Sequence, residues 1–540
     1  MYDVSLTESY FPPQDDHAVQ AITVGDLLRT IAQQNPQGVA LVEIDDHGAS
    51  AAQWTYGELL LKTESLALAL STRYPKGERV VVWAPNIANW ILMEYACALA
   101  GLVLVTANPS FQEKELAYVL EQSKAVGLFL VEEFRSNPMR RIANEALKGN
   151  ERVREVISLD DHANLFKIGD QEARLPVVLP EDPVQIQYTS GTTGFPKGAI
   201  LSHGGLAKNA GLFASRKGVN QHSVWANFMP FFHTAGCATG ALGCLQAGCQ
   251  MLVIKRFDAE IFAQLIENMG VTTCFAVPTM LFELLESLDR TPRDVSSLEV
   301  ISTGGAPVPP ELVRRVKSTL GCHLLSAFGQ TEHSPMISLN PISATVEQIV
   351  ETAGQPLPQT EVSIRSTADN SLVPIGEVGE ICARSYAVMI GYNDNPSATA
   401  DAIDEDGWLH TGDLGTIDSQ GFIRVTGRVK DMIIRGGENH FPAEIEAVLI
   451  THDAISQVAV VGIPDEKWGE VIGAFILSEV SLSVGDLRAH CRKELSAQKT
   501  PSVWVRVPEF PLTGSGKVQK YAIRDKYLAG DYPEVLPHDS

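Results

Sequence analysis

Short aliphatic runs alternate with helical stretches through the N-terminal half of the chain, and this alternation constrains the fold more than any other feature. Residues 56–72 and 87–100 have helical patterns, whereas 79–83 and 126–131 are short apolar runs typical of buried strands. Strands separated by helices indicate an α/β layer. We therefore expect a first α/β subdomain over residues 1–180.

The alternation resumes after a glycine-rich loop and predicts a second α/β subdomain over residues 181–353. Its expected strands are 251–254, 273–277, 299–302 and 323–325, and its expected helices are 258–267 and 310–318. Short strands and turns over 354–427 then predict a small β-barrel subdomain. After a polar segment at 428–431, residues 432–540 predict a small α+β domain.

Composition excludes several classes of protein. A net charge of −23 argues against nucleic acid or an anionic membrane as partner. The eight cysteines lack metal-ligand spacing, so we expect reduced thiols and a cytoplasmic location. The most apolar window, 90–107, is interrupted by Glu94 and Gly101, which predicts a buried helix followed by a strand and no transmembrane segment. Peripheral membrane contact and a homodimer are left open.

Residues 188–198 read Tyr-Thr-Ser-Gly-Thr-Thr-Gly-Phe-Pro-Lys-Gly directly after a strand-like run. Glycines allow backbone N–H groups to turn inward, hydroxyls add donors, and Lys197 adds a positive charge, so the segment can bind phosphate. A solvated turn is the alternative. The segment is not a Walker loop, because Gly198 stands where that motif has Ser or Thr.

Two more polar segments, 303–307 (Thr-Gly-Gly-Ala-Pro) and 326–332 (Ser-Ala-Phe-Gly-Gln-Thr-Glu), each follow an expected strand. Open α/β sheets bind ligands at the carboxyl ends of their strands, so both segments are expected at one crevice. Asp413, in a Thr-Gly-Asp sequence, is either a turn cap or a ligand-binding carboxylate.

The 188–198 segment resembles the phosphate loop of the adenylate-forming superfamily, which includes acyl-CoA synthetases, peptide-synthetase adenylation domains and beetle luciferases. Four further signatures of that superfamily follow in order: Phe-Gly-Gln-Thr-Glu at 328–332, Thr-Gly-Asp at 411–413, Gly-Arg-Val-Lys-Asp at 427–431 and Gly-Lys at 516–517. The resemblance implies an N-terminal AMP-binding domain over 1–427, a hinge at 428–431 and a mobile C-terminal lid over 432–540.

The resemblance also implies which residues bind the nucleotide. The phosphates would be held by Thr189, Ser190, Gly191, Thr192, Thr193, Gly194 and Lys197. The adenine would contact Gly305, Ala306, Ala327 and Phe328, although most relatives have Tyr at the last position, and the ribose would contact Asp413 and Arg428.

For catalysis, the resemblance implies that Thr331 contacts the α-phosphate while Glu332 and Thr189 hold Mg²⁺. Lys517 would bridge the substrate carboxylate and the α-phosphate as charge builds in the transition state. Lys430 would be the residue about which the lid rotates.

The acyl and CoA sites are implied in the same way. His233 would act at the acyl and thiol pockets, although a lone histidine among aromatics is more often a core residue. Ala235, Thr239 and Gly305 would line the acyl pocket. Arg256 would hold the CoA nucleotide, a surface cation being the alternative, and Gly436 and Gly437 would let pantetheine pass.

The resulting hypothesis is a ligase that uses ATP, Mg²⁺ and coenzyme A. It would convert a medium- or long-chain or bulky alicyclic carboxylic acid to acyl-AMP and pyrophosphate, then to acyl-CoA and AMP. An acyl-adenylating enzyme that loads an acyl carrier protein is the first alternative. A nucleotide- or acyl-binding protein without turnover is the second, and the intact charges at Lys197, Glu332, Asp413, Arg428 and Lys517 argue against it.

Overall fold

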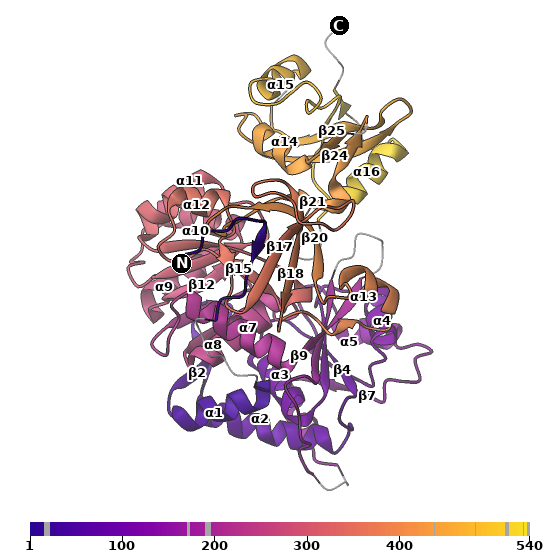
Figure 1. Cartoon of the computed structure of the whole chain (residues 1–540). Coiled ribbons are helices and arrows are strands. Elements are labelled where there is room, and N and C mark those ends of the chain that lie inside the picture. Colours follow the sequence, from indigo (N-terminus) through magenta and orange to yellow (C-terminus); the bar gives the residue numbers. More distant parts are fainter. Residues whose placement is uncertain are drawn as a thin grey trace.

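A computed structural model describes residues 1–15, 22–169, 173–189, 196–436, 438–480, 482–512, 518–532 and 534–536. The chain forms a large N-terminal α/β part and a smaller C-terminal α+β part, which lies beyond strands β20 and β21 (Figure 1). This arrangement confirms the expected fold class.

The first layer is a seven-stranded sheet of order β19-β9-β8-β5-β4-β6-β7. Its strands are β4 (Arg79–Trp83), β5 (Val103–Ala107), β6 (Gly127–Leu130), β7 (Glu155–Ser158), β8 (Pro183–Thr189), β9 (Lys197–Ser202) and β19 (Gly391–Tyr392). The central strands are parallel, and β9 and β19 are added antiparallel at one edge. Helices α2 (Tyr56–Ser71), α3 (Ala88–Ala100), α4 (Glu113–Gln122) and α5 (Met139–Ala146) belong to this layer. The apolar window at 90–107 is therefore the buried helix α3 followed by β5, as predicted.

The second layer is a nine-stranded sheet of order β16-β15-β14-β13-β12-β10-β11-β2-β3. Its strands are β2 (Val39–Ile44), β3 (Ser50–Thr55), β10 (Val224–Asn227), β11 (Gln250–Ile254), β12 (Thr273–Ala276), β13 (Val300–Gly304), β14 (His323–Gly329), β15 (Met336–Leu339) and β16 (Gln355–Pro356). Its helices include α7 (His203–Arg216), α9 (Ala259–Met269), α10 (Pro278–Arg290) and α11 (Pro310–Arg315). The helix expected over 310–318 changes to a π-helix at Val316–Leu320, and a second π-helix spans Ala235–Leu242.

The third unit is an antiparallel five-stranded sheet of order β1-β17-β18-β20-β21. Its strands are β1 (Tyr10–Phe11), β17 (Thr360–Arg365), β18 (Gly379–Ser385), β20 (Leu409–Ile417) and β21 (Ile423–Arg428). Phe11 from the N-terminus packs with Val362, Ile364 and Ile381 in its core. In the described part of the chain the strand order runs from β1 to β21, and no pairing joins these two ends into a closed barrel.

Sheet membership crosses the subdomain boundaries expected from the sequence. Strands β8 and β9 follow residue 181 but join the first sheet, whereas β2 and β3 precede residue 180 but join the second. Hydrophobic patterning identifies strands and does not say which neighbours they pair with. The domain limits therefore stay a prediction.

The C-terminal part contains one six-stranded sheet, in which β24 (Gln457–Asp465) pairs with β25 (Gly469–Leu477). The other strands are β22 (Ile433–Arg435), β23 (Glu438–His440), β26 (Val503–Arg506) and β27 (Glu534–Val535), and the helices are α14 (Pro442–Leu449), α15 (Val484–Cys491) and α16 (Lys520–Ala529). Two separate apolar clusters pack within this part. No helix of the described residues is long and apolar enough to cross a membrane.

Lys217, the residue after helix α7, is fully buried in the second layer. Its Nζ donates to the carbonyl of Cys274 at 2.6 Å and lies 4.2 Å from the centre of the Trp225 ring. Burial lowers the pKa of Lys217 to about 7, because the charged ammonium loses its hydration inside the protein.

We expect Lys217→Met to abolish one component of the pH dependence of stability. Between the folded pKa of about 7 and the unfolded value of about 10.4, the unfolded chain binds one more proton, so the wild type gains stability as pH rises. The variant should lack this gain. Urea unfolding at pH 7 and pH 9.5 gives the change in the free energy of unfolding for each protein, and this change should be larger in the wild type than in the variant.

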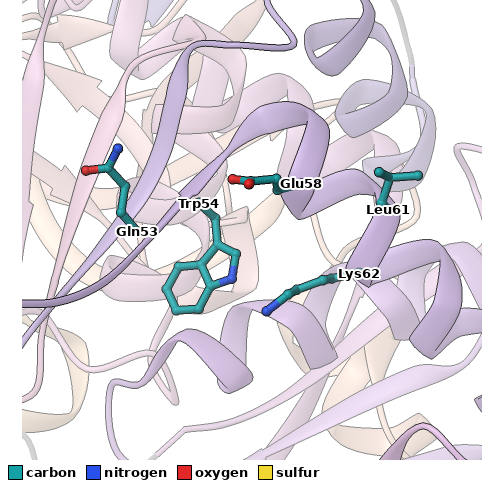
Figure 2. A pocket seen from close by; sticks show the side chains of 5 residues that line it. All are labelled: Gln53, Trp54, Glu58, Leu61 and Lys62. Carbon is teal, nitrogen blue, oxygen red and sulfur yellow. The ribbon is translucent and has the colours of Figure 1, made fainter.

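Lys62→Met is the matched control, because the exposed Lys62 also lies over an indole ring, 5.2 Å from the centre of Trp54 (Figure 2). This variant should keep the wild-type pH dependence. An identical slope in wild type and Lys217→Met would contradict the burial of a neutral lysine.

Candidate functional site

The predicted phosphate loop joins two hydrogen-bonded strands. Strand β8 ends at Thr189 and β9 begins at Lys197, and these two residues pair directly in the antiparallel register. Thr189 and Lys197 therefore form the base of a β-hairpin. The predicted phosphate-binding residues Ser190, Gly191, Thr192, Thr193 and Gly194 lie outside the described residues.

Buried side-chain hydrogen bonds link strand β8 to helix α3 and to the π-helix. Gln185 donates to Glu94 of α3 at 2.6 Å, and Gln187 donates to Gln185 at 2.8 Å. Burial raises the pKa of Glu94 to about 8, which favours a neutral carboxylic acid. Gln187 also reaches the sulfur of Cys237 in the π-helix at 3.2 Å. The hairpin strand is thus tied to both layers.

Glu332 lies at the centre of the candidate site. It belongs to a 3₁₀ turn, Thr331–His333, that follows strand β14, and only 9% of its surface is exposed. Its Oε1 accepts a hydrogen bond from the Tyr392 hydroxyl at 2.8 Å and one from Thr189 Oγ1 at 3.3 Å. The structure therefore brings together Glu332 and Thr189, the two predicted Mg²⁺ ligands. A carboxylate and a hydroxyl are oxygen donors of the kind that Mg²⁺ binds.

Tyr392 is not among the site residues predicted from the sequence. Burial, and then the negative charge of Glu332, raise the pKa of Tyr392, so its hydroxyl stays protonated and donates to the carboxylate. Lys197 Nζ lies 4.8 Å from the centre of the Tyr392 ring. The sequence around Gly391 predicts only turns and short strands; the contact arises because β19 pairs with β9.

The segment before β19 ties the five-stranded sheet to this turn. Ser385 Oγ lies 2.9 Å from His333 Nε2, and the backbone N–H of Met389 donates to the carbonyl of Glu332 at 2.8 Å. These bonds fix the backbone of Glu332 and the side chain of the next residue, His333. Burial lowers the pKa of His333 to about 4, so this histidine is neutral.

The predicted adenine-contacting residues lie at the ends of two neighbouring parallel strands. Gly304 of β13 is in register with Ala327 of β14, so Gly305 and Ala306 follow beside Phe328. Gly305 has a φ of +80°, a conformation that favours glycine. Gly305 and Ala306 are exposed and Phe328 is half-buried, so backbone and ring surfaces remain available at this edge.

Asp413 and Arg428, predicted to contact ribose, are opposite each other on β20 and β21. Arg428 Nε lies 2.9 Å from Asp413 Oδ1, and the Asp413 side chain is 8% exposed against 51% for Arg428. The structure therefore brings this pair together.

The residues predicted for the hinge and lid are only partly described. Lys430 is exposed in a 3₁₀ turn, Val429–Asp431, between β21 and β22. Gly436 has a φ of +60°, and its N–H donates to the carbonyl of Trp468 at 2.8 Å. A Cβ atom at this position would lie 3.0 Å from the Trp468 ring. Lys517 and Gly437 lie outside the described residues.

Of the residues predicted for the acyl pocket, His233, Ala235 and Thr239 lie at the π-helix, whereas Gly305 follows strand β13. His233 precedes the π-helix, and its Nδ1 accepts from the N–H of Ala235 at 3.1 Å. Ala235 and Thr239 are both buried in this helix, a form often found at functional sites. Arg256 is exposed after strand β11, and its role at the CoA nucleotide stays a prediction.

Two family models match the chain. One, described as AMP-binding enzyme, matches residues 28–393, and the other, described as AMP-binding enzyme C-terminal domain, matches residues 444–517. The first covers more than half of the sequence and includes the hairpin, Glu332 and Tyr392.

Known relatives match over almost the whole chain. YngI of Bacillus subtilis (strain 168) is 35% identical, over 94% of this chain and 97% of its own. The medium-chain acyl-CoA ligase ACSF2 of Bos taurus, named as mitochondrial, is 34% identical over 93% of this chain and 87% of its own.

Solved structures match in the same way. The o-succinylbenzoate CoA synthetase MenE of Bacillus subtilis, in complex with its acyl-adenylate intermediate, has a TM-score of 0.82 and 29% identity, covering 92% of this chain and 98% of its own. A structure of MenE with ATP and a magnesium ion has a TM-score of 0.81.

We expect Tyr392→Phe to weaken Mg²⁺-dependent ATP binding about tenfold, because a hydrogen bond to a charged group contributes roughly 1.5–3 kcal/mol. Isothermal titration calorimetry with ATP at several Mg²⁺ concentrations measures the change. Tyr386→Phe is the matched control: Lys208 lies over this ring too, and among the described residues the Tyr386 hydroxyl makes no hydrogen bond to a carboxylate. Equal losses in both variants would contradict a role for Tyr392 in orienting Glu332.

Proposed function

Because this chain belongs to the AMP-binding enzyme family, in the acyl-CoA synthetase branch of the adenylate-forming superfamily, we propose that it converts a medium-chain carboxylic acid to its CoA thioester. The enzyme is an AMP-forming acyl-CoA ligase that uses ATP, Mg²⁺ and coenzyme A. The observation that carries the site assignment is the hydrogen-bonded cluster of the buried Glu332 with the half-buried Thr189 and Tyr392 beside the base of the hairpin.

In the first half-reaction a carboxylate oxygen of the substrate attacks the α-phosphorus of ATP, and the bond to pyrophosphate breaks. The substrate is itself the nucleophile, so the chain supplies positioning and charge. Lys197 and the hairpin would hold the outer phosphates, Thr331 would contact the α-phosphate, and Lys517 would neutralise the charge that develops there.

Glu332 and Thr189 would hold Mg²⁺, which when bound neutralises phosphate charge. The chain's own contribution is orientation. Tyr392 and Thr189 bond the same carboxylate oxygen, Oε1, and the Met389 N–H fixes the backbone of Glu332.

The rest of ATP would lie across the strand ends. The adenine would lie between the Gly305–Ala306 backbone and Phe328, a site that uses a backbone edge and an aromatic face. The ribose hydroxyls would bond Asp413, whose carboxylate accepts two hydrogen bonds, with Arg428 beside it.

In the second half-reaction the thiol sulfur of CoA attacks the acyl carbonyl carbon and AMP leaves. The lid would rotate about Lys430, so that Lys517 withdraws and the Gly436–Gly437 turn faces the pantetheine arm. Gly436 has a φ of +60° and lies against the Trp468 ring, so a larger residue at this turn would be strained. His233 would lie at the entrance between the acyl and thiol sites.

A medium-chain acid is supported by the 34% identity to ACSF2 of Bos taurus, a medium-chain acyl-CoA ligase by name, and by the small residue Ala235 in the π-helix. Loading of an acyl carrier protein is not favoured, since the relatives are named as CoA ligases. We also propose a cytoplasmic location, which the eight free, buried cysteines support.

A product assay tests the substrate class. With ATP, Mg²⁺ and CoA, we expect decanoate to give acyl-CoA and AMP with a kcat/KM at least about tenfold above butyrate, because each buried methylene contributes ~0.8 kcal/mol. Mass spectrometry identifies the products. Ala235→Phe should lower kcat/KM for decanoate about tenfold and leave the KM for ATP unchanged. Acyl-AMP that never passes to CoA would contradict the CoA-ligase assignment.

Lys517→Ala should separate the two half-reactions. Formation of acyl-AMP should fall roughly 10²–10³-fold, because one fixed charge at the transition state is lost. Transfer from supplied acyl-AMP to CoA should persist. Lys520→Ala is the control, since Lys520 lies in the same domain and pairs with Glu446 at 2.7 Å. Wild-type adenylation in Lys517→Ala would contradict the assignment.

A further inference from the structure

Asp413 is carried by a bulge in strand β20. Glu380 of β18 is in register with Leu414, whereas Cys382 is in register with His410. Three residues of β20, 411–413, therefore lie opposite the single residue 381 of β18. Bulges of this kind re-aim side chains and are common beside active sites.

Hydrogen bonds to the Thr411 and Glu380 side chains hold the bulge. Thr411 Oγ1 donates to the carbonyl of Ile381 at 2.6 Å and accepts from the N–H of Asp413 at 3.1 Å. The N–H of Gly412, whose φ is +72°, donates to Glu380 Oε1 at 2.9 Å. The Glu380 carboxylate thus replaces the strand partner that the bulge removes from Gly412.

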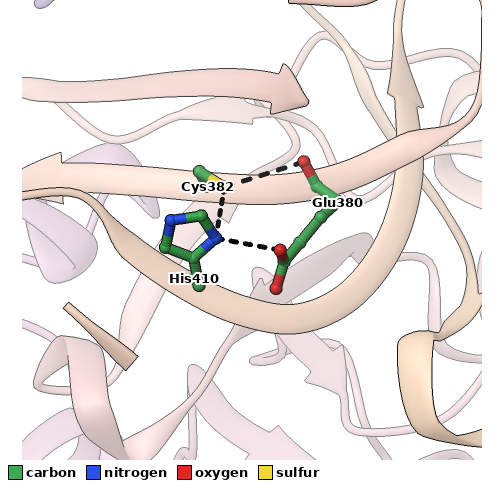
Figure 3. A group of neighbouring side chains, drawn as sticks. All are labelled: Glu380, Cys382 and His410. Carbon is green, nitrogen blue, oxygen red and sulfur yellow. Dashed lines mark hydrogen bonds and ion pairs between the residues drawn. The ribbon is translucent and has the colours of Figure 1, made fainter. Parts of the chain in front are cut away.

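The other oxygen of Glu380 bonds an imidazole. His410 Nδ1 lies 2.9 Å from Glu380 Oε2 (Figure 3). Its Nε2 lies 3.5 Å from Asp404 Oδ2. The thiol of Cys382 lies 3.5 Å from His410 Nδ1. Both Glu380 and His410 are largely buried, with 15% and 21% of their side chains exposed.

The charges facing His410 favour its protonated form. Glu380 is the main partner of His410, and Asp404 is the second. Arg365, at the end of strand β17, lies 3.9 Å from Asp404. The hydrogen bond that His410 donates to Glu380 raises the pKa of His410 above its ordinary value despite burial. Burial raises the pKa of the Cys382 thiol, which therefore stays neutral.

Glu380, Cys382 and His410 also place three ligand-type atoms within 4.8 Å of one another. Hydrogen bonds account for this geometry without an ion. Both oxygens of Glu380 and both nitrogens of His410 already face protein partners.

We propose that Glu380 and His410 are positioning residues, which hold the 411–413 bulge in the conformation that presents Asp413 to the ribose of the nucleotide. This inference rests on the proposed contact between Asp413 and ribose. It also predicts a pH dependence. The ion pair is complete while His410 is protonated and weakens as pH rises through its raised pKa, above about 6.5, so nucleotide affinity should fall in that direction.

The test is the affinity for AMP, measured by calorimetry from pH 7 to pH 9, above the titration of the AMP phosphate. Glu380→Gln should weaken binding about tenfold at pH 7, the loss that displacement of a binding group produces. His410→Gln should bind AMP more weakly than wild type at pH 7 and should show no change between pH 7 and pH 9. The wild type should lose affinity over this range.

Glu361→Gln is the matched control. Glu361 pairs with Arg384 at 2.8 Å on the same sheet and, within the described residues, makes no hydrogen bond or ion pair with residues 411–413, so AMP affinity should match the wild type. Thermal unfolding of each variant separates loss of fold from loss of positioning.

Asp413→Asn distinguishes the proposed contact between Asp413 and ribose from the positioning role of Glu380 and His410. If it weakens AMP binding while Glu380→Gln and His410→Gln do not, the positioning inference is wrong and the ribose contact stands. If Asp413→Asn leaves AMP affinity unchanged, the ribose contact itself is wrong, and the inference with it. A wild-type affinity that does not change between pH 7 and pH 9 would contradict the role of His410 charge.

Discussion

The arrangement of the site depends on the hydrogen bonds that the Glu332 carboxylate accepts. The carboxylate accepts hydrogen bonds from Thr189 at the end of β8 and from Tyr392 in β19, two segments far apart in the sequence. A buried carboxylate is costly unless it is hydrogen-bonded, so the three segments are held in one geometry. That geometry sets an anionic oxygen beside the hairpin that would hold the phosphates.

The five-stranded sheet is linked to this point through its own loops. Ser385, at the end of strand β18, contacts His333 in the turn that contains Glu332. The chain then continues into β19, which pairs with β9. Strand β20 carries Asp413 on a bulge that Glu380 supports. The proposed nucleotide site therefore lies where three sheets meet, and a shift in one sheet would move residues in the others.

Local patterning predicted the strands and helices well. Strand β4 was predicted with its observed limits, and α2, α3 and β11 to within one residue, because their apolar periodicity decides the conformation locally. Tyr392 could not be found in this way, since nothing near Gly391 indicates a contact with Glu332. The division between the first two subdomains was also not local: the pairing of β8 with β5, and of β2 with β11, is set by tertiary packing.

The sequence by itself determined the alternation of strands and helices and the chemistry of the motifs, because the hydroxyls, glycines and charges of each motif are contiguous in the chain. It also predicted functional roles for Glu332, Asp413 and Lys197. The tertiary structure decided which motifs meet, that Tyr392 completes the Glu332 cluster, and that Glu380 and His410 lie behind Asp413. Side-chain hydrogen bonds between distant strands depend on register and burial, which a linear pattern does not encode.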